Sequence, residues 1–173
     1  KMLTTFMLSL IPNLQRNFLP VDNLSKQGNT ARSINGIRMA LGHIHEGGGL
    51  GLFPAGEVST WQWGAKRAAS RPFVIEDKPW AENIVKLIRK SGLPVYPILF
   101  EGRNSLSFHL LGLLHPRLRT VRLVHELFNK KGTHVKVHIG APILPEVLQS
   151  MDIPTLRAFL RESCYRLNVP PSA

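Results

Sequence analysis

Cysteine is almost absent from this sequence, and acidic residues are scarce. The 173 residues include one cysteine, Cys164, which excludes an internal disulfide and a cysteine-rich zinc site. A chain without disulfides fits a reducing compartment. Asp and Glu number 11 against 22 Lys and Arg, so the formal net charge is +11 with neutral histidines. This excess favours an anionic partner, such as nucleic acid, an anionic membrane surface, a phosphorylated small molecule or an acidic carrier protein; a basic surface without a partner is the alternative.

Long apolar runs are missing as well. The apolar opening at residues 2–11, MLTTFMLSLI, is well short of the roughly 20 residues that a membrane-spanning helix needs. Its apolar residues recur at helical spacing with little charge between them: Met2, Leu3, Phe6, Met7, Leu10 and Ile11. The segment is therefore expected to form a helix, either within the core or lying in a membrane interface.

Apolar periodicity further along the chain predicts three helices. One runs from Ala31 to Ile44 and ends at the glycines of residues 47–49. The second begins near Pro79 and ends at Gly92, with acidic residues before it and basic residues in its last turn. A terminal amphipathic helix has an apolar face made of Leu156, Phe159, Leu160 and Leu167.

Short apolar or alternating runs predict strands between these helices. Residues 17–22 are expected to form a short strand, and the continuous apolar runs at 50–54 and 94–100 are expected to be buried strands, as in a parallel sheet. Residues 135–139 alternate and predict a half-exposed strand, whereas residues 55–78 are expected to form a long loop. The sequence thus predicts an α/β fold, a single domain over residues 1–173 with a mostly parallel or mixed central sheet flanked by helices.

Polar residues follow two of these strands. Gly56, Glu57 and Ser59 come after residues 50–54, and the turn Glu-Gly-Arg-Asn-Ser at 101–105 comes after residues 94–100. Ligands of open α/β sheets bind beyond the carboxyl ends of strands, so the turns around positions 57 and 101 are expected to line one cleft. Either turn alone would equally suit a solvated loop without function.

Three blocks of the sequence resemble the glycerolipid acyltransferase family, the lysophosphatidic acid acyltransferase-like enzymes. LFPAGEVS at 52–59 is similar to the Phe-Pro-Glu-Gly-Thr-Arg-Ser block, in the version of the bacterial branch labelled hemolysin-like or lyso-ornithine lipid acyltransferase. GLPVYPILFEGRNS at 92–105 is similar to that branch's later apolar block. NFLPVDN at 17–23 resembles the block between the catalytic motif and the glycine-rich loop. The resemblance extends from residue 1 to about residue 145.

The resemblance implies a membrane lipid enzyme of bacteria. Its reaction would transfer a fatty acyl group from the thioester of acyl carrier protein or coenzyme A to the hydroxyl of a lysolipid, at the cytoplasmic face of the cell membrane. No metal and no further cofactor are expected, and the partners are the lysolipid, the acyl thioester and an anionic membrane surface. The implied substrate-binding residues are Asp22, Phe53, Pro54, Ala55, Gly56, Glu57, Ser59, Glu101, Gly102, Arg103 and Asn104.

The family's catalytic motif, His-x-x-x-x-Asp, is missing from this sequence. None of the seven histidines is followed by Asp five residues later. In the family the aspartate orients the imidazole, which takes the proton of the acceptor hydroxyl as that hydroxyl attacks. The motif lies upstream of the block that NFLPVDN resembles, so we expect this sequence to be a fragment that lacks its amino-terminal catalytic block. A degenerate, inactive homologue is the alternative.

Acidic residues stand where phosphate-using members of the family carry arginine. This chain has Asp22 after the short strand, and Glu57-Val58 in place of Thr-Arg. Because a carboxylate is a poor phosphate ligand, the acceptor is expected to lack a free phosphomonoester. An amino-acid-containing lysolipid, whose ammonium group pairs with Glu57 or Asp22, would fit.

Two other features bear on partners. Residues 110–124 mix leucines with Arg117, Arg119 and Arg122, which suits an anionic lipid surface, where each cation is worth about 1 kcal/mol; an ordinary core segment is the alternative. His43 and His45 fit no familiar metal spacing. His134 and His138 are expected to be exposed and roughly 13 Å apart, too far to share an ion.

A nucleic-acid-binding module is the alternative from another class, and a noncatalytic lipid-binding domain is a third possibility. Trp61 and Trp63, with Lys66, Arg67 and Arg71, would combine base stacking with phosphate contacts. No nucleic-acid partner is expected, however, because continuous apolar strands and carboxylate-bearing turns are not required for such binding.

Overall fold

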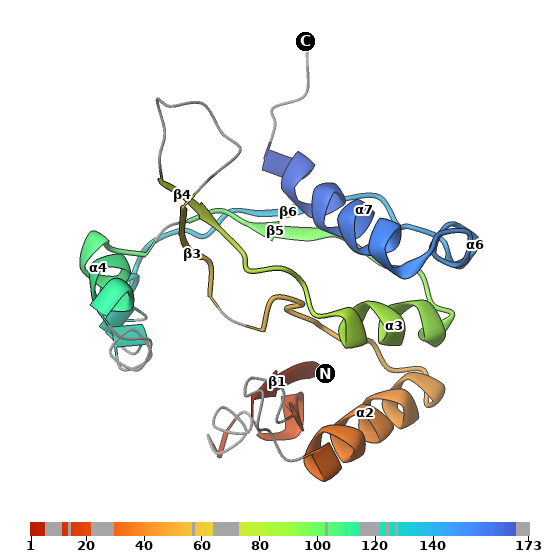
Figure 1. The fold of residues 1–173 in the computed structure, drawn as a ribbon. Coiled ribbons are helices and arrows are strands. Elements are labelled where there is room, and N and C mark those ends of the chain that lie inside the picture. The colour runs from red at the N-terminus through yellow and green to blue at the C-terminus, as the bar shows by residue number, and fades with distance from the viewer. Residues whose placement is uncertain are drawn as a thin grey trace. The chain divides into compact units, whose positions relative to one another are not determined.

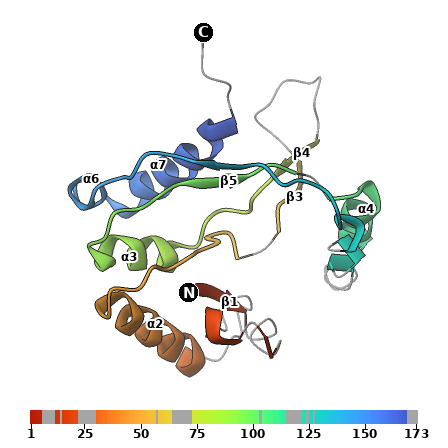
Figure 2. The ribbon, with the colours of Figure 1, turned by 180° about the vertical axis from the view of Figure 1, so that it is seen from behind.

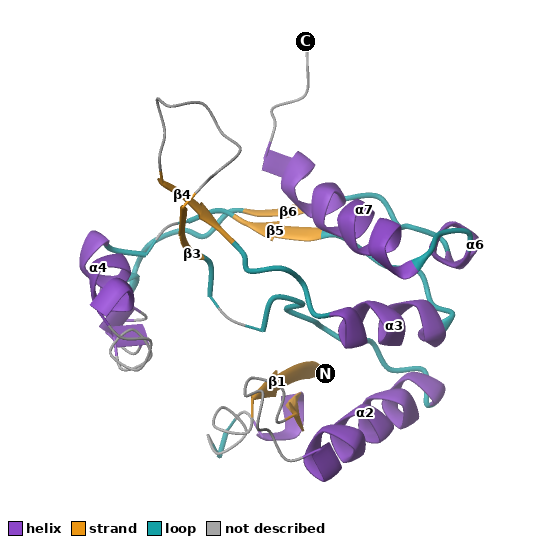
Figure 3. Ribbon diagram, viewed as in Figure 1, coloured by secondary structure: helices purple, strands orange, loops and turns teal. Residues whose placement is uncertain are grey.

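The computed structural model describes residues 1–5, 12–13, 15–21, 30–56, 58–63, 73–102, 104–114, 122–123, 125–126 and 128–168. Helices and strands alternate along the chain, so the predicted mixed α/β class is confirmed (Figure 1, Figure 3). The chain divides into two compact units, which are described separately: unit 1 is Lys1–Val58, Pro79–Val95 and Leu144–Arg157, and unit 2 is Ser59–Lys78, Tyr96–Ile143 and Ala158–Ala173. The expectation of a single domain stays a prediction.

Unit 1 contains a small parallel sheet. β1 (Met2–Thr5) pairs in parallel with β2 (Phe18–Val21), which follows the short 3-10 helix η1 (Gln15–Asn17). On its other side β1 bridges Gly51 in parallel: the Leu3 N–H donates to the Gly51 carbonyl at 2.9 Å, and the Gly51 N–H donates to the Lys1 carbonyl at 2.7 Å. β1 is therefore the middle of three parallel segments.

The predicted helix over residues 2–11 is wrong for Met2–Thr5, and residues 6–11 lie outside the described part of the chain. A short apolar run does not distinguish a helix from a buried strand by its period. Pairing on both sides of β1 satisfies its backbone donors and acceptors, and Leu3 becomes buried. That tertiary pairing outweighs the helical spacing of the apolar residues.

Helix α2 (Thr30–His45) forms as predicted and packs against β2. It ends before Gly47, whose φ of +82° lies in the left-handed region that favours glycine. The predicted strand at 50–54 forms only in part: Gly51 pairs with Met2, but Phe53 is exposed and the chain turns at Pro54. Proline lacks the N–H that a longer ladder would need.

Helix α3 (Glu82–Ser91) also forms as predicted. Its apolar face is buried together with Trp80, and Gly92 ends it at φ +65°. α3 contacts α2 and α6 (Pro145–Gln149) (Figure 1, Figure 2). Leu148 of α6 is buried. α7 (Ile153–Tyr165) begins in this unit, where the Asp152 carboxylate accepts a hydrogen bond from the Thr155 N–H at 2.9 Å and so caps the helix.

Unit 2 contains two antiparallel strand pairs. β3 (Thr60–Trp63) pairs with β4 (Phe73–Glu76), so the prediction of a long loop over 55–78 is wrong. The segments TWQW and FVIE are rich in the aromatic and β-branched residues typical of strands, but each is only four residues long. β5 (Ile98–Phe100) pairs with β6 (Val137–Ile139), and the end of the chain adds η2 (Arg166–Asn168).

The predicted buried parallel strand at 94–100 is also corrected. β5 has three residues, runs antiparallel to β6 and exposes Ile98 and Phe100. Pro94 and Pro97 remove two backbone donors from the apolar run and so limit its length. Among the described residues the strands make three pairs rather than the expected central sheet.

Candidate functional site

The turn after β5, residues 101–105, is held at both ends by contacts from distant parts of unit 2. The Glu101 N–H donates to the Lys136 carbonyl at 2.9 Å, which extends the β5–β6 pairing by one residue. Gly102 follows with φ +147°, within the left-handed range that favours glycine. Arg103 lies outside the described residues. The turn then leads into α4 (Leu106–Leu114).

At the first end of the turn, Glu101 pairs with His138. Leu99 and His138 lie opposite each other in the β5–β6 pair, and Glu101, two residues beyond Leu99, faces the same side. His138 Nε2 lies 2.6 Å from Glu101 Oε1, and Lys136 Nζ lies 3.9 Å from Glu101 Oε2. The hydrogen bond with His138 holds the pKa of Glu101 below its usual range, although desolvation opposes the shift. Glu101 is thus an ionised acceptor at neutral pH.

The prediction of exposure for His134 and His138 is half right. His134 is exposed as expected, but His138 is half-buried and bonded to Glu101. The period of two along residues 134–139 placed both histidines on one face, but it contained no information about which strand lies alongside. Only the antiparallel register with β5 brings His138 to Glu101.

At the second end, Ser105 connects the turn to Glu126. The Ser105 hydroxyl donates to Glu126 Oε1 at 2.5 Å, and the Ser105 N–H donates to Glu126 Oε2 at 2.9 Å. The same hydroxyl accepts a hydrogen bond from the Phe108 N–H at 3.3 Å, which makes Ser105 the N-cap of α4. Glu126 is only 3% exposed. Hydrogen bonding from the Ser105 hydroxyl lowers the pKa of Glu126 despite the desolvation that burial brings.

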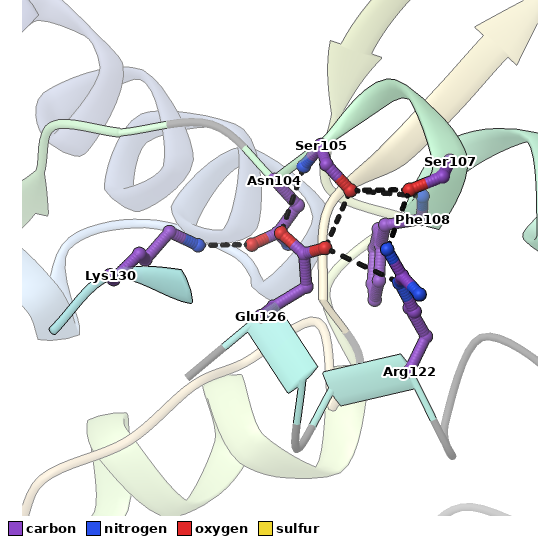
Figure 4. Close-up of polar contacts among 7 residues, drawn as sticks. All are labelled: Asn104, Ser105, Ser107, Phe108, Arg122, Glu126 and Lys130. Atoms are coloured by element: carbon purple, nitrogen blue, oxygen red, sulfur yellow. Dashed lines mark hydrogen bonds and ion pairs between the residues drawn. The ribbon is translucent and has the colours of Figure 1, made fainter. Parts of the chain in front are cut away.

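Four further side chains complete this network. Figure 4 shows the Glu126 carboxylate pointing toward Ser105, with Arg122 on one side and Asn104 and Lys130 on the other. Arg122 Nε lies 3.8 Å from Glu126 Oε1, and its Nη2 donates to the Ser107 hydroxyl at 3.1 Å. Lys130 donates to the Asn104 side-chain oxygen. The buried charge of Glu126 is therefore compensated by hydrogen bonds and by a cation, as burial of a carboxylate requires.

Glu126 and Lys130 were not predicted as site residues. Both lie more than twenty residues from the turn that they hold, and no spacing in the sequence connects them to it. The segment that contains Arg122 was predicted to contact lipid, with an ordinary core segment as the alternative. The Arg122 side chain is two-thirds covered and engages Ser107 and Glu126. Arg117 and Arg119 lie outside the described residues.

The second predicted turn, Phe53–Gly56, belongs to unit 1. The Gly56 N–H donates to the Phe53 carbonyl at 2.9 Å, and Gly56 has φ +67°, so a side chain at this position would be strained. The Pro54 carbonyl accepts a hydrogen bond from the Ala81 N–H at 2.9 Å, which attaches the turn to the start of α3. Ala55 is half-buried, whereas Phe53 is exposed.

The parallel direction of β1, β2 and Gly51 brings two blocks of the sequence to one edge. β2 ends at Val21, the last residue before Asp22, and the segment through Gly51 continues into the Phe53–Gly56 turn. Because all three segments run the same way, both blocks leave the sheet at its carboxyl edge. This is the edge at which ligands of α/β sheets bind.

Ser59 is engaged within unit 2. Its hydroxyl donates to Asp77 Oδ1 at 2.5 Å, and the Asp77 N–H donates to the Tyr165 hydroxyl at 3.1 Å. Next to Asp77, Glu76 accepts a charge-assisted hydrogen bond from Arg161 Nη2 at 3.1 Å. These contacts fix the ends of β3 and β4 against the last turns of α7, so Ser59 has a clear structural role.

Of the eleven predicted site residues, the structure describes Phe53, Pro54, Ala55, Gly56, Ser59, Glu101, Gly102 and Asn104. Asp22, Glu57 and Arg103 lie outside the described residues. The expectation that the turns around 57 and 101 line one cleft therefore stays a prediction. Lys66, Arg67 and Arg71, on which the nucleic-acid alternative depends, also lie outside them.

The described residues contain no group of three His, Cys, Asp or Glu side chains placed to hold a metal ion. Within the same residues, no helix has the length and apolar character needed to cross a membrane.

Comparisons with protein-family models, with curated proteins and with solved structures found no match for this chain.

Proposed function

We propose that this chain provides the acceptor-binding part of a glycerolipid acyltransferase-like enzyme with that family's α/β fold. The reaction moves a fatty acyl group from the thioester of acyl carrier protein or coenzyme A to the hydroxyl of a lysolipid at the cytoplasmic membrane surface. The observation that carries the proposal is the shared edge in unit 1. There the NFLPVDN and LFPAGEVS blocks, both similar to blocks of this family, leave one parallel sheet in the same direction.

The charge of the predicted site supports an acceptor with a cationic head group. Asp22 and Glu57 follow the two segments that reach this edge. Carboxylates repel a phosphomonoester and pair with an ammonium group. An amino-acid-containing lysolipid therefore fits better than lysophosphatidic acid.

In the proposal, the paired groups around residues 101–105 position the turn. His138 Nε2 bonds Glu101 across the β5–β6 pair, and both Glu126 oxygens accept hydrogen bonds from Ser105. In the proposal, the proton of the acceptor hydroxyl goes to the histidine of the His-x-x-x-x-Asp block that the family resemblance implies. Without that block, the same residues would make a noncatalytic lipid-binding domain.

The test is acyl transfer by the complete gene product, with lyso-ornithine lipid and lysophosphatidic acid as competing acceptors. We expect the amino-acid lysolipid to be acylated faster. Glu57→Gln should slow that reaction about tenfold, since it removes one charge-assisted interaction of roughly 1.5 kcal/mol. Glu46→Gln, which changes an exposed glutamate at the end of α2, is the matched control and should leave the rate unchanged.

Three outcomes would contradict this proposal in different ways. Faster acylation of lysophosphatidic acid would overturn the head-group assignment. Binding of the lysolipid without turnover would favour the noncatalytic domain. A salt-sensitive gel shift with nucleic acid at physiological ionic strength, together with no lipid binding, would support the nucleic-acid module instead.

A further inference from the structure

Helix α4 presents an exposed row of leucines. Leu106, Leu110 and Leu113 are 70%, 53% and 60% exposed. Their spacing of four and three residues places them on one helical face. Phe108 and His109 are buried, so the leucine row lies on the exposed side of the helix. α4 also contacts β3 within the same unit.

A fourth exposed apolar side chain lies in the segment that contacts the start of α4. Phe128 is 70% exposed. Its segment is tied to the turn before α4 and to the first turn of the helix by the Glu126 hydrogen bonds to Ser105, by Arg122 on Ser107, and by Lys130 on Asn104 (Figure 4). We call Leu106, Leu110 and Leu113 the α4 patch.

Charge identifies the partner of this patch. The stretch of sequence from 106 to 131 contains five cations, Arg117, Arg119, Arg122, Lys130 and Lys131, against one anion, Glu126. The whole chain has a net charge of +11. Leucine and phenylalanine side chains flanked by lysine and arginine are typical of elements that lie in an anionic membrane interface. An acidic protein would match this charge as well, but a row of exposed leucines at helical spacing favours insertion into a bilayer interface.

We propose that the α4 patch inserts into the interface of an anionic lipid bilayer and docks unit 2 on the membrane. The inference names the membrane contact of the proposed acyltransferase and rests on that function for the choice of a lipid surface. Binding is measured on vesicles that contain no acyl donor and no lysolipid. Loss of docking and loss of acyl transfer are therefore separate results.

The exposed face of the β5–β6 pair is the main competitor within the chain. Ile98, Phe100, Val137 and Ile139 are exposed there and are cross-strand neighbours. An environment-sensitive fluorophore on a single cysteine distinguishes the two faces, in a Cys164→Ser background. We expect the fluorescence of the Leu110→Cys label to shift to shorter wavelength with anionic vesicles, and that of the Ile139→Cys label to stay unchanged. A shift at position 139 alone would overturn the assignment to α4.

The binding experiment uses Leu106→Ser, Leu110→Ser and Leu113→Ser together. Binding to vesicles of phosphatidylglycerol and phosphatidylcholine should fall at least about tenfold, because the variant has polar serines in place of the three leucines that the proposal inserts into the bilayer interface. The matched control is Leu93→Ser with Leu144→Ser, two exposed leucines outside α4, and should bind like the unmodified protein. Circular dichroism of each variant checks folding, which exposed leucines should not affect.

Lipid composition tests the role of charge. Binding should fall when phosphatidylglycerol is replaced by phosphatidylcholine, and when salt is raised from about 0.05 M to about 0.5 M, because screening shortens the reach of the cations. Equal binding to neutral vesicles would overturn the electrostatic part. If the triple variant instead turns a dimer into a monomer and keeps its vesicle affinity, the patch contacts a second copy and the proposal is wrong.

Discussion

At the residue scale, the buried carboxylate of Glu126 determines how the turn at 101–105 is held. It accepts two hydrogen bonds from Ser105 and lies beside Arg122. Its two oxygens both hold Ser105, the last residue of the turn and the N-cap of α4. Glu101 does similar work at the other end through His138, but there both side chains are more than one-third exposed. The strength of the turn therefore depends mostly on Glu126.

Glu126→Gln should destabilise unit 2 by about 1–3 kcal/mol, because the hydrogen bonds from Ser105 lose their charged acceptor and Arg122 loses its counterion. Urea unfolding at pH 7 measures the loss. Glu146→Gln, on the exposed side of α6, is the matched control and should change stability by less than about 0.5 kcal/mol. Equal effects of the two substitutions would show that the hydrogen bonds and the ion pair of Glu126 do not contribute to folding stability.

The difference in folding stability between the unmodified protein and Glu126→Gln should depend on pH. The pKa of Glu126 is lowered in the folded state from its ordinary value of 4.5, so its ionised form stabilises the fold at pH values above 4.5. As the pH falls below 4.5 toward the lowered folded pKa, the unmodified protein loses this contribution and Glu126→Gln does not. The stability difference between them should therefore be constant near neutral pH and shrink in acid.

At the element scale, the sequence predicted the helices α2, α3 and α7 and the strands β2 and β6, but it missed α4 and α6. α2 and α3 combine an apolar period with glycine stops, and these local cues agree with the final structure. β1 was predicted as a helix, and β3 and β4 were predicted as loop, because strands of four residues are too short for a period to be read. The partners in each pair are decided by contacts between residues far apart in the chain.

The candidate site residues also divide into those that the local sequence predicted and those that only long-range contacts bring to the turn. Glu101 and Asn104 were predicted because polar residues directly follow an apolar run. His138 and Lys130, which hold them, and Glu126, which holds Ser105, come from segments 21 to 37 residues away. All three were missed, because His138 was predicted to be exposed and the other two were not considered. A sequence indicates where a polar turn follows a strand, but not which distant side chain reaches it.

Gly92→Ala tests one helix stop that the sequence did predict. Gly92 ends α3 at φ +65°, and a Cβ there would meet no atom within 4 Å. Gly92→Ala should therefore lower the free energy of unfolding by about 1–2 kcal/mol through backbone strain alone. Gly49→Ala is the matched control: it too has open space and no left-handed φ, so it should be nearly neutral. Urea unfolding compares the two, and equal losses would refute the strain.

At the scale of the whole molecule, the number of unfolding transitions distinguishes one domain from two. A single domain unfolds in one cooperative transition, whereas two independent units unfold in two. Gly92 belongs to unit 1 and Glu126 to unit 2. Helix α7, Ile153–Tyr165, contributes residues to both units and buries Leu156 and Leu160. A helix of this length loses stability if either half loses its packing, because short isolated helices are marginal in water.

We therefore expect the chain to unfold in one transition. Gly92→Ala and Glu126→Gln should each lower the same midpoint, and since they share no partner, the double variant should lose the sum of the two within about 0.5 kcal/mol. Urea unfolding followed by circular dichroism and by tryptophan fluorescence measures this, because Trp80 lies in unit 1 whereas Trp61 and Trp63 lie in unit 2. If the two units fold independently, the two probes will separate. Gly92→Ala would then move only the transition of unit 1, and Glu126→Gln only that of unit 2.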